Sequence, residues 1–405
     1  MISIKDKIYF KKVKIVKKKS NNTQLIRHGT IRSNFNETSE SLFLTSGFIY
    51  NSAEEAELCF KEKKKKFMYS RFGNPTVEMF QRKLAKIEGA EACWATSTGM
   101  AAVFSIFMSQ LSSGDRIISS KALFGSCQYI ITKLLPKYGI EVVLVDGKNI
   151  DEWKKELKKK TKLIFFETPS NPCLELIDIK EVSRIAHENG VKVIVDNVFA
   201  TPILQKPISL GADIVMYSAT KHIDGQGRVL GGAILGKKKF CDEIIKPFIR
   251  NTGPSISPFN AWILLKSLET LELRVNQQVE NADKIVTFLK KHQKIKKVLY
   301  PWSEDFPQYG LAKKQMLSGG SIISFEFKDK TKKQTFKFLN KLKMINISNN
   351  LGDTKSLITH PSTTTHSRLN KSEKRELGIS ENLVRLSVGL ECSEDIIKDI
   401  KKGLE

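Results

Sequence analysis

The strongest constraint on the fold of this chain is a series of short, unbroken apolar runs between about residue 90 and residue 236. Unbroken rather than alternating apolar character indicates strands that are buried on both faces, as in a mostly parallel sheet covered by helices. Helical stretches such as "DIKEVSRIAHENG" separate the runs. The last run follows its predecessor too closely for a helical crossover, so we expect that strand to be antiparallel. The runs are "RIIS", "VVLV", "LIFF", "VKVIV", "DIVMY" and "GGAIL".

Segments of a different character flank this region. Residues 76–89 have the apolar spacing of an amphipathic helix that ends at Gly89. After about residues 253–262 we expect a smaller α+β unit, with a long and bent helix over 261–292, a strand at "SIISFEFKD", a helix at "TFKFLNKLK" and a strand at "LVRLSVGLE". The predicted organisation is a basic tail over 1–22, an irregular arm over 23–75, an α/β domain over 76–256 and an α+β domain over 257–405.

The formal net charge of +24 over 405 residues raises the question of a polyanionic partner. The lysines are spread over most of the chain, and no segment concentrates arginines with interleaved aromatic residues. We therefore interpret the charge as lysine on solvated faces, with a basic nucleic-acid-binding protein as the alternative. No apolar run approaches the roughly 18 residues that span a bilayer. The Lys-rich start is interpreted as a solvated tail, with a targeting segment as the alternative.

The cysteines and histidines show no metal-ligand spacing. The six cysteines form no CxxC pair, which favours reduced thiols, a cytoplasmic location and no structural zinc. His360 and His366 lack carboxylate companions at ligand spacing, so we expect ordinary loop hydrogen bonding there.

Polar side chains follow several of the buried runs. Asn171 comes shortly after "LIFF", Asp196 directly after "VKVIV", and Ser218, Thr220 and Lys221 after "DIVMY". Because ligands bind beyond the carboxyl ends of the strands in such sheets, we expect these groups to gather at one edge. A further segment, Thr98 to Met100, stands at the start of an apolar helix, where free N–H groups can bind a phosphate.

Pyridoxal phosphate (PLP) would use all of these groups at once. Its aldehyde needs a lysine amine for a Schiff base, and its ring nitrogen needs an acid to stay protonated. Its phosphate needs N–H and hydroxyl donors, and its ring needs a stacking partner. The residues that would fill these places are, in that order, Lys221; Asp196; Thr98, Gly99, Met100, Ser218 and Thr220; and Phe124.

From about residue 23 to its end, the chain resembles the Cys/Met-metabolism family of PLP-dependent enzymes, which have the aspartate-aminotransferase-like fold type I. The motifs that carry the resemblance are "YSRFGNPT" (69–76), "TGMAA" (98–102), "ETPSNP" (167–172), "VDNVFATP" (195–202), "YSATKHIDGQGRVLGG" (217–232), "QMLSGG" (315–320) and "SLITHPSTTTH" (356–366). Within the family, "ALFGSC", "SATKHIDGQGR" and "NNLGDTKSLITHPSTTTHSRL" are most similar to the branch that acts on O-succinylhomoserine with sulfide. The residues themselves give no physical reason why that branch needs "HIDGQGR".

The resemblance implies a role for each matching residue. Lys221 would hold the cofactor, Asp196 would pair with its ring nitrogen, and Asn171 would bind its phenolic oxygen. Gly99, Met100, Ser218 and Thr220 would bind its phosphate. Tyr69 and Arg71 would reach the phosphate of a neighbouring subunit, which implies at least a homodimer and commonly a tetramer. Arg385 would clamp the substrate carboxylate.

Two positions depart from the usual pattern of the family. The residue that stacks on the ring is usually Tyr and is Phe124 here, so the proton-transfer role of the phenol is absent or passes to Lys221. Asn350 stands where Ser is frequent in the carboxylate site and could still donate through its amide. The sulfhydrylase branch shares both features, so we interpret them as marks of a subtype.

The expected function is PLP-dependent γ-replacement on an O-acylhomoserine, with O-succinylhomoserine and sulfide as the expected substrates and homocysteine as the product. Cystathionine γ-synthase and O-acetylhomoserine sulfhydrylase remain open alternatives, followed by a γ-lyase and the non-catalytic nucleic-acid binder. The expected partners are small molecules and further copies of the chain, with neither nucleic acid nor membrane.

Overall fold

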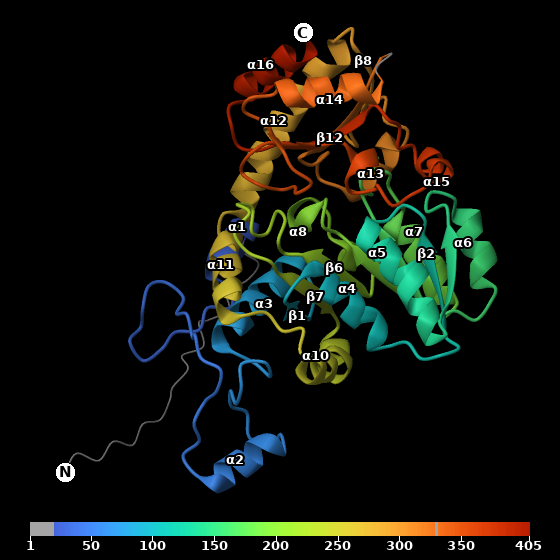
Figure 1. Ribbon diagram of the computed structural model, residues 1–405. Coiled ribbons are helices and arrows are strands. Elements are labelled where there is room, and N and C mark those ends of the chain that lie inside the picture. Colours follow the sequence, from blue (N-terminus) through green and yellow to red (C-terminus); the bar gives the residue numbers. More distant parts are fainter. Residues whose placement is uncertain (1–19, 329–330) are drawn as a thin grey trace.

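The computed structural model describes residues 20–328 and 331–405. The predicted basic tail lies outside the described residues up to residue 19, and the first helix, α1 (Asn21–Arg27), begins inside its last positions. Figure 1 shows a large unit around one sheet, a smaller C-terminal unit packed on one side of it, and an N-terminal arm that projects from the large unit. Within the described residues, no helix is both long and apolar enough to cross a membrane.

The large unit contains a seven-stranded sheet in the order β1-β7-β6-β5-β4-β2-β3. Every strand pair is parallel except the two pairs that β7 makes with β6 and β1. The α/β fold with a mostly parallel sheet and the antiparallel "GGAIL" strand are thus confirmed. The sequence analysis missed β1, because its alternation of small and large residues did not read as an unbroken apolar run. The strands are β1 (Ala92–Thr96), β2 (Arg116–Ser120), β3 (Glu141–Val145), β4 (Leu163–Glu167), β5 (Lys192–Asp196), β6 (Ile214–Ser218) and β7 (Gly232–Gly236).

Helices cover both faces of this sheet and bury two apolar clusters, one on each side. The predicted helix that ends at Gly89 is α3 (Pro75–Glu88), capped by Asn74 and stopped by Gly89 in the left-handed conformation. The other helices of this unit are α4 (Gly99–Met108), α5 (Gly125–Tyr129), α6 (Ile150–Leu157), α7 (Ile179–Glu188), α8 (Thr201–Leu204), α9 (Lys238–Phe240) and α10 (Lys246–Thr252).

Two consecutive helices join the large unit to the small one. The predicted long, bent helix is α11 (Pro258–Leu268) followed by α12 (Leu271–Lys291), with the break at residues 269–270. The boundary that we expected after residue 256 falls in the loop before α11, yet the buried leucines of α11 still pack in the core of the large sheet. The core of the small unit begins on α12 at Ala282.

The small unit is a five-stranded sheet in the order β10-β11-β12-β9-β8, covered by helices. The predicted strands at "SIISFEFKD" and "LVRLSVGLE" are its neighbouring strands β9 and β12, and the predicted helix between them is α14. The elements are β8 (Ile295–Leu299), α13 (Tyr309–Gln315), β9 (Ile322–Phe327), α14 (Lys332–Lys341), β10 (Asn346–Ile347), β11 (Leu357–Thr359), α15 (Lys371–Glu376), β12 (Leu383–Ser387) and α16 (Ser393–Leu404).

The arm is less irregular than we expected, because it contains α1 and α2 (Ala53–Phe60). Both helices are shorter than the roughly 12–15 residues at which a helix becomes stable by itself, so their sequences carry little periodic signal. α1 is held by contacts with α3, whereas α2 lies far out on the arm (Figure 1).

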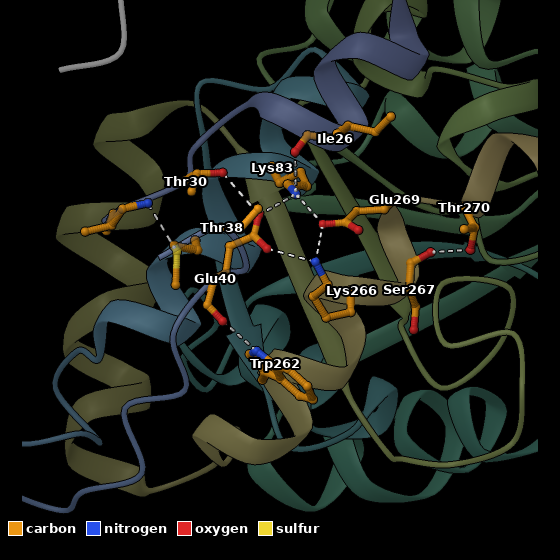
Figure 2. Close-up of polar contacts among 12 residues, drawn as sticks. Ile26, Thr30, Thr38, Glu40, Lys83, Trp262, Lys266, Ser267, Glu269 and Thr270 are labelled. Atoms are coloured by element: carbon orange, nitrogen blue, oxygen red, sulfur yellow. Dashed lines mark hydrogen bonds and ion pairs between the residues drawn. The ribbon is translucent and has the colours of Figure 1, made fainter. Parts of the chain in front are cut away.

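A buried cluster of charges fixes the base of the arm to the large unit (Figure 2). We call Glu40, Lys83, Lys266 and Glu269 the arm cluster. Lys83 is fully buried, and its Nζ lies 3.5 Å from Glu40 Oε1 and 3.8 Å from Glu269 Oε1. Lys266 Nζ donates to Glu40 Oε2 at 2.9 Å and to Glu269 Oε1 at 2.6 Å.

The carboxylate of Glu40 is well supported in this cluster. Burial by itself would raise the pKa of Glu40, but the hydrogen bond from Lys266 and the charge of Lys83 outweigh it and lower that pKa to about 2. The hydroxyl of Thr30 also donates to Glu40 Oε1, at 3.1 Å. Trp262 Nε1 donates to the carbonyl of Glu40 at 2.8 Å. The arm is therefore joined to α3 and α11 through both the side chain and the backbone of one residue.

Candidate functional site

The ends of three neighbouring strands bring the predicted site residues together. β4, β5 and β6 lie side by side in the sheet and end at Glu167, Asp196 and Ser218. Asn171 follows β4 in a turn, and Lys221 follows β6 in the next loop. Parallel strands direct their carboxyl ends to one edge, and this is why groups far apart in the sequence meet here.

Lys221 reaches toward the small unit. Its Nζ donates a hydrogen bond to Asn350 Oδ1 at 2.6 Å. Burial, with the positive charge of Arg385 as a second cause, lowers the pKa of the Lys221 amine to about 8. A neutral amine is the form that forms a Schiff base or accepts a proton, so this environment prepares Lys221 for both roles.

Asp196 is a buried carboxyl with little local support. Its Oδ1 accepts one hydrogen bond from the backbone N–H of Val198, at 3.0 Å. Burial raises the pKa of Asp196 to about 7, and the hydrogen bond from Val198 only partly opposes this. A cation placed next to this carboxyl would favour its ionised form, so the site is suited to a protonated ring nitrogen.

Arg385 lies on β12 of the small unit, and its side chain is almost completely buried. One Nη atom donates to Asn171 Oδ1 at 2.9 Å, and the other donates to the carbonyls of Asn349 and Asn350 at 2.9 and 3.2 Å. Among the described residues, no acceptor lies within hydrogen-bonding distance of Arg385 Nε. A buried charged donor without a partner is costly, and a carboxylate bound here would satisfy it.

The start of α4 lies against the end of β6. A Cβ built on Gly99 would lie 2.6 Å from Cβ of Ser218, and one built on Gly232 would lie 2.2 Å from the carbonyl oxygen of Thr98. Only glycine permits such close packing. The hydroxyl of Thr98 caps the helix by accepting from Ala101 N at 3.0 Å. The first N–H groups of the helix, at Gly99 and Met100, have no acceptor in the helix itself and can bind an anion.

The hydroxyl of Thr220, predicted to bind phosphate, is engaged with the backbone of Gly231. Its Oγ1 accepts from Gly231 N at 3.0 Å and lies 3.3 Å from Gly231 O. Phe124 is partly buried at the N-terminus of α5, and its backbone N–H donates to Glu167 Oε2 at 2.8 Å. Both residues thus stay at this edge of the sheet through backbone hydrogen bonds.

Tyr69 and Arg71 lie on the arm. Tyr69 is 42% exposed, and the Arg71 guanidinium lies over the rings of Tyr69 and Phe72 and donates to the carbonyl of Arg250. Within the described residues, no hydrogen bond or ion pair joins either of them to the other predicted cofactor residues. Their assignment to the site of a neighbouring subunit therefore stays a prediction.

The loop "HIDGQGR" has a structural explanation that the sequence did not supply. A Cβ on Gly225 would lie 1.8 Å from Arg274 Nη1, and one on Gly227 would lie 2.8 Å from Asp353 Oδ2. The carbonyl of Gly225 accepts from Thr354 N at 2.8 Å. His222 Nε2 lies 2.8 Å from Ser321 Oγ. The loop therefore connects Lys221 to the segments of the small unit that precede β9 and β11.

Comparison with known proteins identifies the type of enzyme. Residues 22–405 match the family model described as Cys/Met metabolism PLP-dependent enzyme. The chain belongs to this family. It is therefore a PLP-dependent enzyme of Cys/Met metabolism, as the resemblance implied.

Two curated members of the family and one solved structure illustrate the range of activities. An O-succinylhomoserine sulfhydrylase of Mycobacterium tuberculosis is 48% identical over 382 residues, which is 94% of each chain. An L-methionine gamma-lyase of Fusobacterium nucleatum subsp. polymorphum is 41% identical over 95% of this chain and 97% of its own. A structure described as an O-acetylhomoserine (thiol)-lyase from Campylobacter jejuni, with a pyridoxyl-lysine phosphate, has a TM-score of 0.91, 31% identity, and covers 95% of this chain and 99% of its own. The fold of this PLP-dependent enzyme is confirmed.

The sequence analysis did not single out Glu167 as a site residue. It ends β4 opposite Asp196 on β5 and is buried at 4% exposure. Burial and the neighbouring charge of Asp196 raise the pKa of the Glu167 carboxyl. The signal was available, since Glu167 begins the quoted "ETPSNP" and ends a buried run, as Asp196 does.

Proposed function

We propose that the enzyme catalyses γ-replacement on O-succinylhomoserine with sulfide, forming homocysteine and releasing succinate. The observation that carries the proposal is the junction at Asn350. Its side chain accepts from the Lys221 amine, while its backbone carbonyl accepts from Arg385. An amine that can take the α-proton of an amino acid thus lies near a guanidinium that can bind its carboxylate.

The residues of the site fit PLP. The close approach of Gly99 to Ser218 places the first N–H groups of α4 beside the end of β6, as a phosphate bound by both segments requires. The raised pKa of Asp196 fits a partner for the ring nitrogen, and the lowered pKa of Lys221 fits a Schiff-base lysine. Asn171 would face the phenolic oxygen, and Phe124 would stack on the ring. When bound, PLP supplies an electron sink that stabilises negative charge next to the substrate amine.

In this proposal, the protein's own groups bind the substrate and move protons. Arg385 would bind the carboxylate through Nε and release hydrogen bonds that it now makes to Asn171 and Asn350. Lys221 Nζ, whose neutral fraction is increased by its lowered pKa, would remove the α-proton and then return protons to carbon. Asn350 Oδ1 would orient the amine between these steps. Phe124 has no hydroxyl, so Lys221 would carry the proton transfers alone.

The active unit in this proposal is at least a homodimer. Tyr69 is exposed, whereas Arg71 donates to the carbonyl of Arg250, and both lie on the arm and would complete the phosphate site of a second copy. The support is the exposure of Tyr69 and the anchoring of the arm by the arm cluster, which directs the arm away from its own site (Figure 1).

The test is to purify the enzyme, record its visible spectrum, and offer O-succinylhomoserine or O-acetylhomoserine with sulfide or cysteine. We expect homocysteine from O-succinylhomoserine and sulfide as the fastest reaction. A preference for cysteine would indicate cystathionine γ-synthase, and a preference for the acetyl ester would indicate O-acetylhomoserine sulfhydrylase. Either result would overturn the proposal.

A methionine γ-lyase is the second candidate, because a relative with that activity is 41% identical over nearly the whole chain. Replacement and elimination differ in the final product. A lyase releases ammonia and 2-oxobutyrate from methionine without added sulfide, whereas the proposed enzyme needs sulfide and consumes no methionine. Measuring the 2-oxo acid from L-methionine alone separates the two functions.

A further inference from the structure

Glu167 lies among the candidate site residues at the carboxyl ends of the strands. It is the last residue of β4, in register with Asp196 on β5, and its side chain is buried. An isolated buried carboxylate is expensive, so its partners indicate why this position holds one.

Each carboxylate oxygen of Glu167 accepts one backbone hydrogen bond. Oε2 accepts from the N–H of Phe124 at 2.8 Å, and Oε1 accepts from the N–H of Asn171 at 2.8 Å. These two residues come from different loops, one after β2 and one after β4. One carboxylate therefore sets the distance between the residue assigned to the face of the cofactor ring and the residue assigned to its phenolic oxygen.

Glu167 is also linked, through Asn171, to Arg385, the residue that would bind the substrate carboxylate. The Asn171 side chain accepts from Arg385 at 2.9 Å, and the charge of Glu167 acts favourably on the guanidinium of Arg385. Glu167 also lies beside Asp196, and the raised pKa values of the two carboxyls mean that this pair holds a proton until a cation binds at that end of the site and favours the ionised forms. A carboxylate that only capped a turn would need neither of these neighbours.

We propose that Glu167 is a positioning residue that holds Phe124 and Asn171 in place for the cofactor ring and that, once a cation is bound at this end of the site, adds negative charge beside Asp196. The proposal rests on the assignment of Phe124 and Asn171 to the ring, and not on the choice of substrate. It predicts that Glu167 governs how tightly PLP binds and how its spectrum responds to pH, before any substrate is added.

The main variant is Glu167→Gln, which keeps the shape, removes the charge and turns one acceptor into a donor that faces a backbone N–H. We expect the apoenzyme to bind PLP about tenfold more weakly, since one of the two backbone hydrogen bonds that place Phe124 and Asn171 is lost. We also expect the visible band of the lysine-bound cofactor to change at a lower pH, because a lost negative charge disfavours protonated forms.

Glu175→Gln is the matched control. Glu175 lies in the loop that follows "ETPSNP", is partly exposed and pairs with Lys148, and its side chain contacts neither Phe124 nor Asn171. We expect its PLP affinity and its spectral midpoint to equal those of the wild type. If Glu167→Gln behaved in the same way as this control, the proposal would be wrong.

Two further measurements distinguish the proposed positioning role of Glu167 from a purely structural role. The gain in thermal stability on adding PLP should shrink in Glu167→Gln, whereas a structural residue would lower apo and holo forms equally. In a double-mutant cycle with Asn171→Ala, the two effects on PLP affinity should be less than additive, because one acts through the other. Full additivity would overturn the proposal, and Glu167→Asp gives the same tests if Glu167→Gln does not fold. None of these readouts requires sulfhydrylase activity, so a failure of the proposed function would be seen separately.

Discussion

Two of the places where the protein buries charged groups, the arm cluster and the candidate site, differ in how completely those groups are satisfied. In the arm cluster, Glu40 has two lysines, a threonine hydroxyl and a pKa lowered to about 2. In the site cluster, which we define as Glu167, Asp196, Lys221 and Arg385, both carboxyl pKa values are raised, and Arg385 Nε has no acceptor among the described residues. Burial lowers the pKa of an amine in both clusters, Lys83 in the first and Lys221 in the second, so the carboxyl groups make the contrast. Charges that are satisfied by protein partners, as in the arm cluster, are typical of structural ion pairs. Buried groups with perturbed pKa values and an unsatisfied donor, as in the site cluster, are typical of a functional site that binds a charged ligand.

The largest expected effect tests the site cluster. Lys221→Met should reduce γ-replacement by about 10³-fold or more and remove the visible absorbance of lysine-bound PLP, because the variant has neither Schiff-base amine nor base. The free energy of unfolding of the apoenzyme should not fall by more than about 1 kcal/mol, since a buried amine is itself unfavourable. Steady-state turnover, a visible spectrum and denaturant unfolding check this. Retained absorbance and turnover would refute the assignment of Lys221.

The next effect tests the arm cluster. Glu40→Gln leaves Lys83 fully buried with its nearest remaining carboxylate, Glu269, 3.8 Å away. We expect the free energy of unfolding to fall by about 3 kcal/mol, the typical result of removing one partner from a buried ion pair. Urea unfolding of the apoenzyme measures this. An unchanged unfolding midpoint would show that the cluster contributes no net stability.

The same exchange of a carboxyl for an amide in the site cluster should change the free energy of unfolding in the opposite direction. Asp196→Asn removes a carboxyl whose pKa is raised by burial, so the apoenzyme should become about 1–2 kcal/mol more stable at pH 8. Turnover should fall sharply because the ring nitrogen loses its acid partner. Denaturant unfolding and steady-state turnover, measured on one preparation, check the expected rise in stability and the expected fall in activity. A less stable Asp196→Asn apoenzyme would contradict the comparison.

The dependence of stability on pH should separate the two sets further. The folded state binds the Asp196 proton more tightly than the unfolded state, so its contribution is full below pH 3.8 and is lost as the pH rises toward about 7. Glu40 behaves in reverse, because its contribution is present above pH 4.5 and is lost as the pH falls toward about 2. The free energy of unfolding of the apo wild type, measured at pH 5 and pH 8, should decrease with pH. The decrease should be smaller in Asp196→Asn, where, in the described part of the chain, Glu88 and Glu167 are the buried carboxyls with raised pKa values that remain.

The smallest expected effect concerns coupling inside the site cluster. Arg385 is the second cause of the lowered pKa of Lys221, so Arg385→Met should raise that pKa above about 8. The rate at which the apoenzyme forms a Schiff base with PLP would then have its pH midpoint at a higher value. Stopped-flow absorbance across pH measures it. An unshifted midpoint would leave burial as the only cause.

The sequence by itself determined the family and all but one strand of the large sheet, and it predicted most of the candidate site. Buried strands leave unbroken apolar runs, and polar residues directly after those runs predicted that Asn171, Asp196, Ser218 and Lys221 would meet at one edge. It did not reveal β1, the helices of the arm or Glu167, because short elements and single carboxylates carry weak local signals.

Only the tertiary structure decided which buried charges belong together. Glu40 and Lys266 are separated by more than two hundred residues in the chain, as are Asn171 and Arg385. Whether a carboxylate is satisfied depends on donors that distant segments bring to it, and on the water that packing removes. That is why the same residue types stabilise the arm and remain unsatisfied at the site.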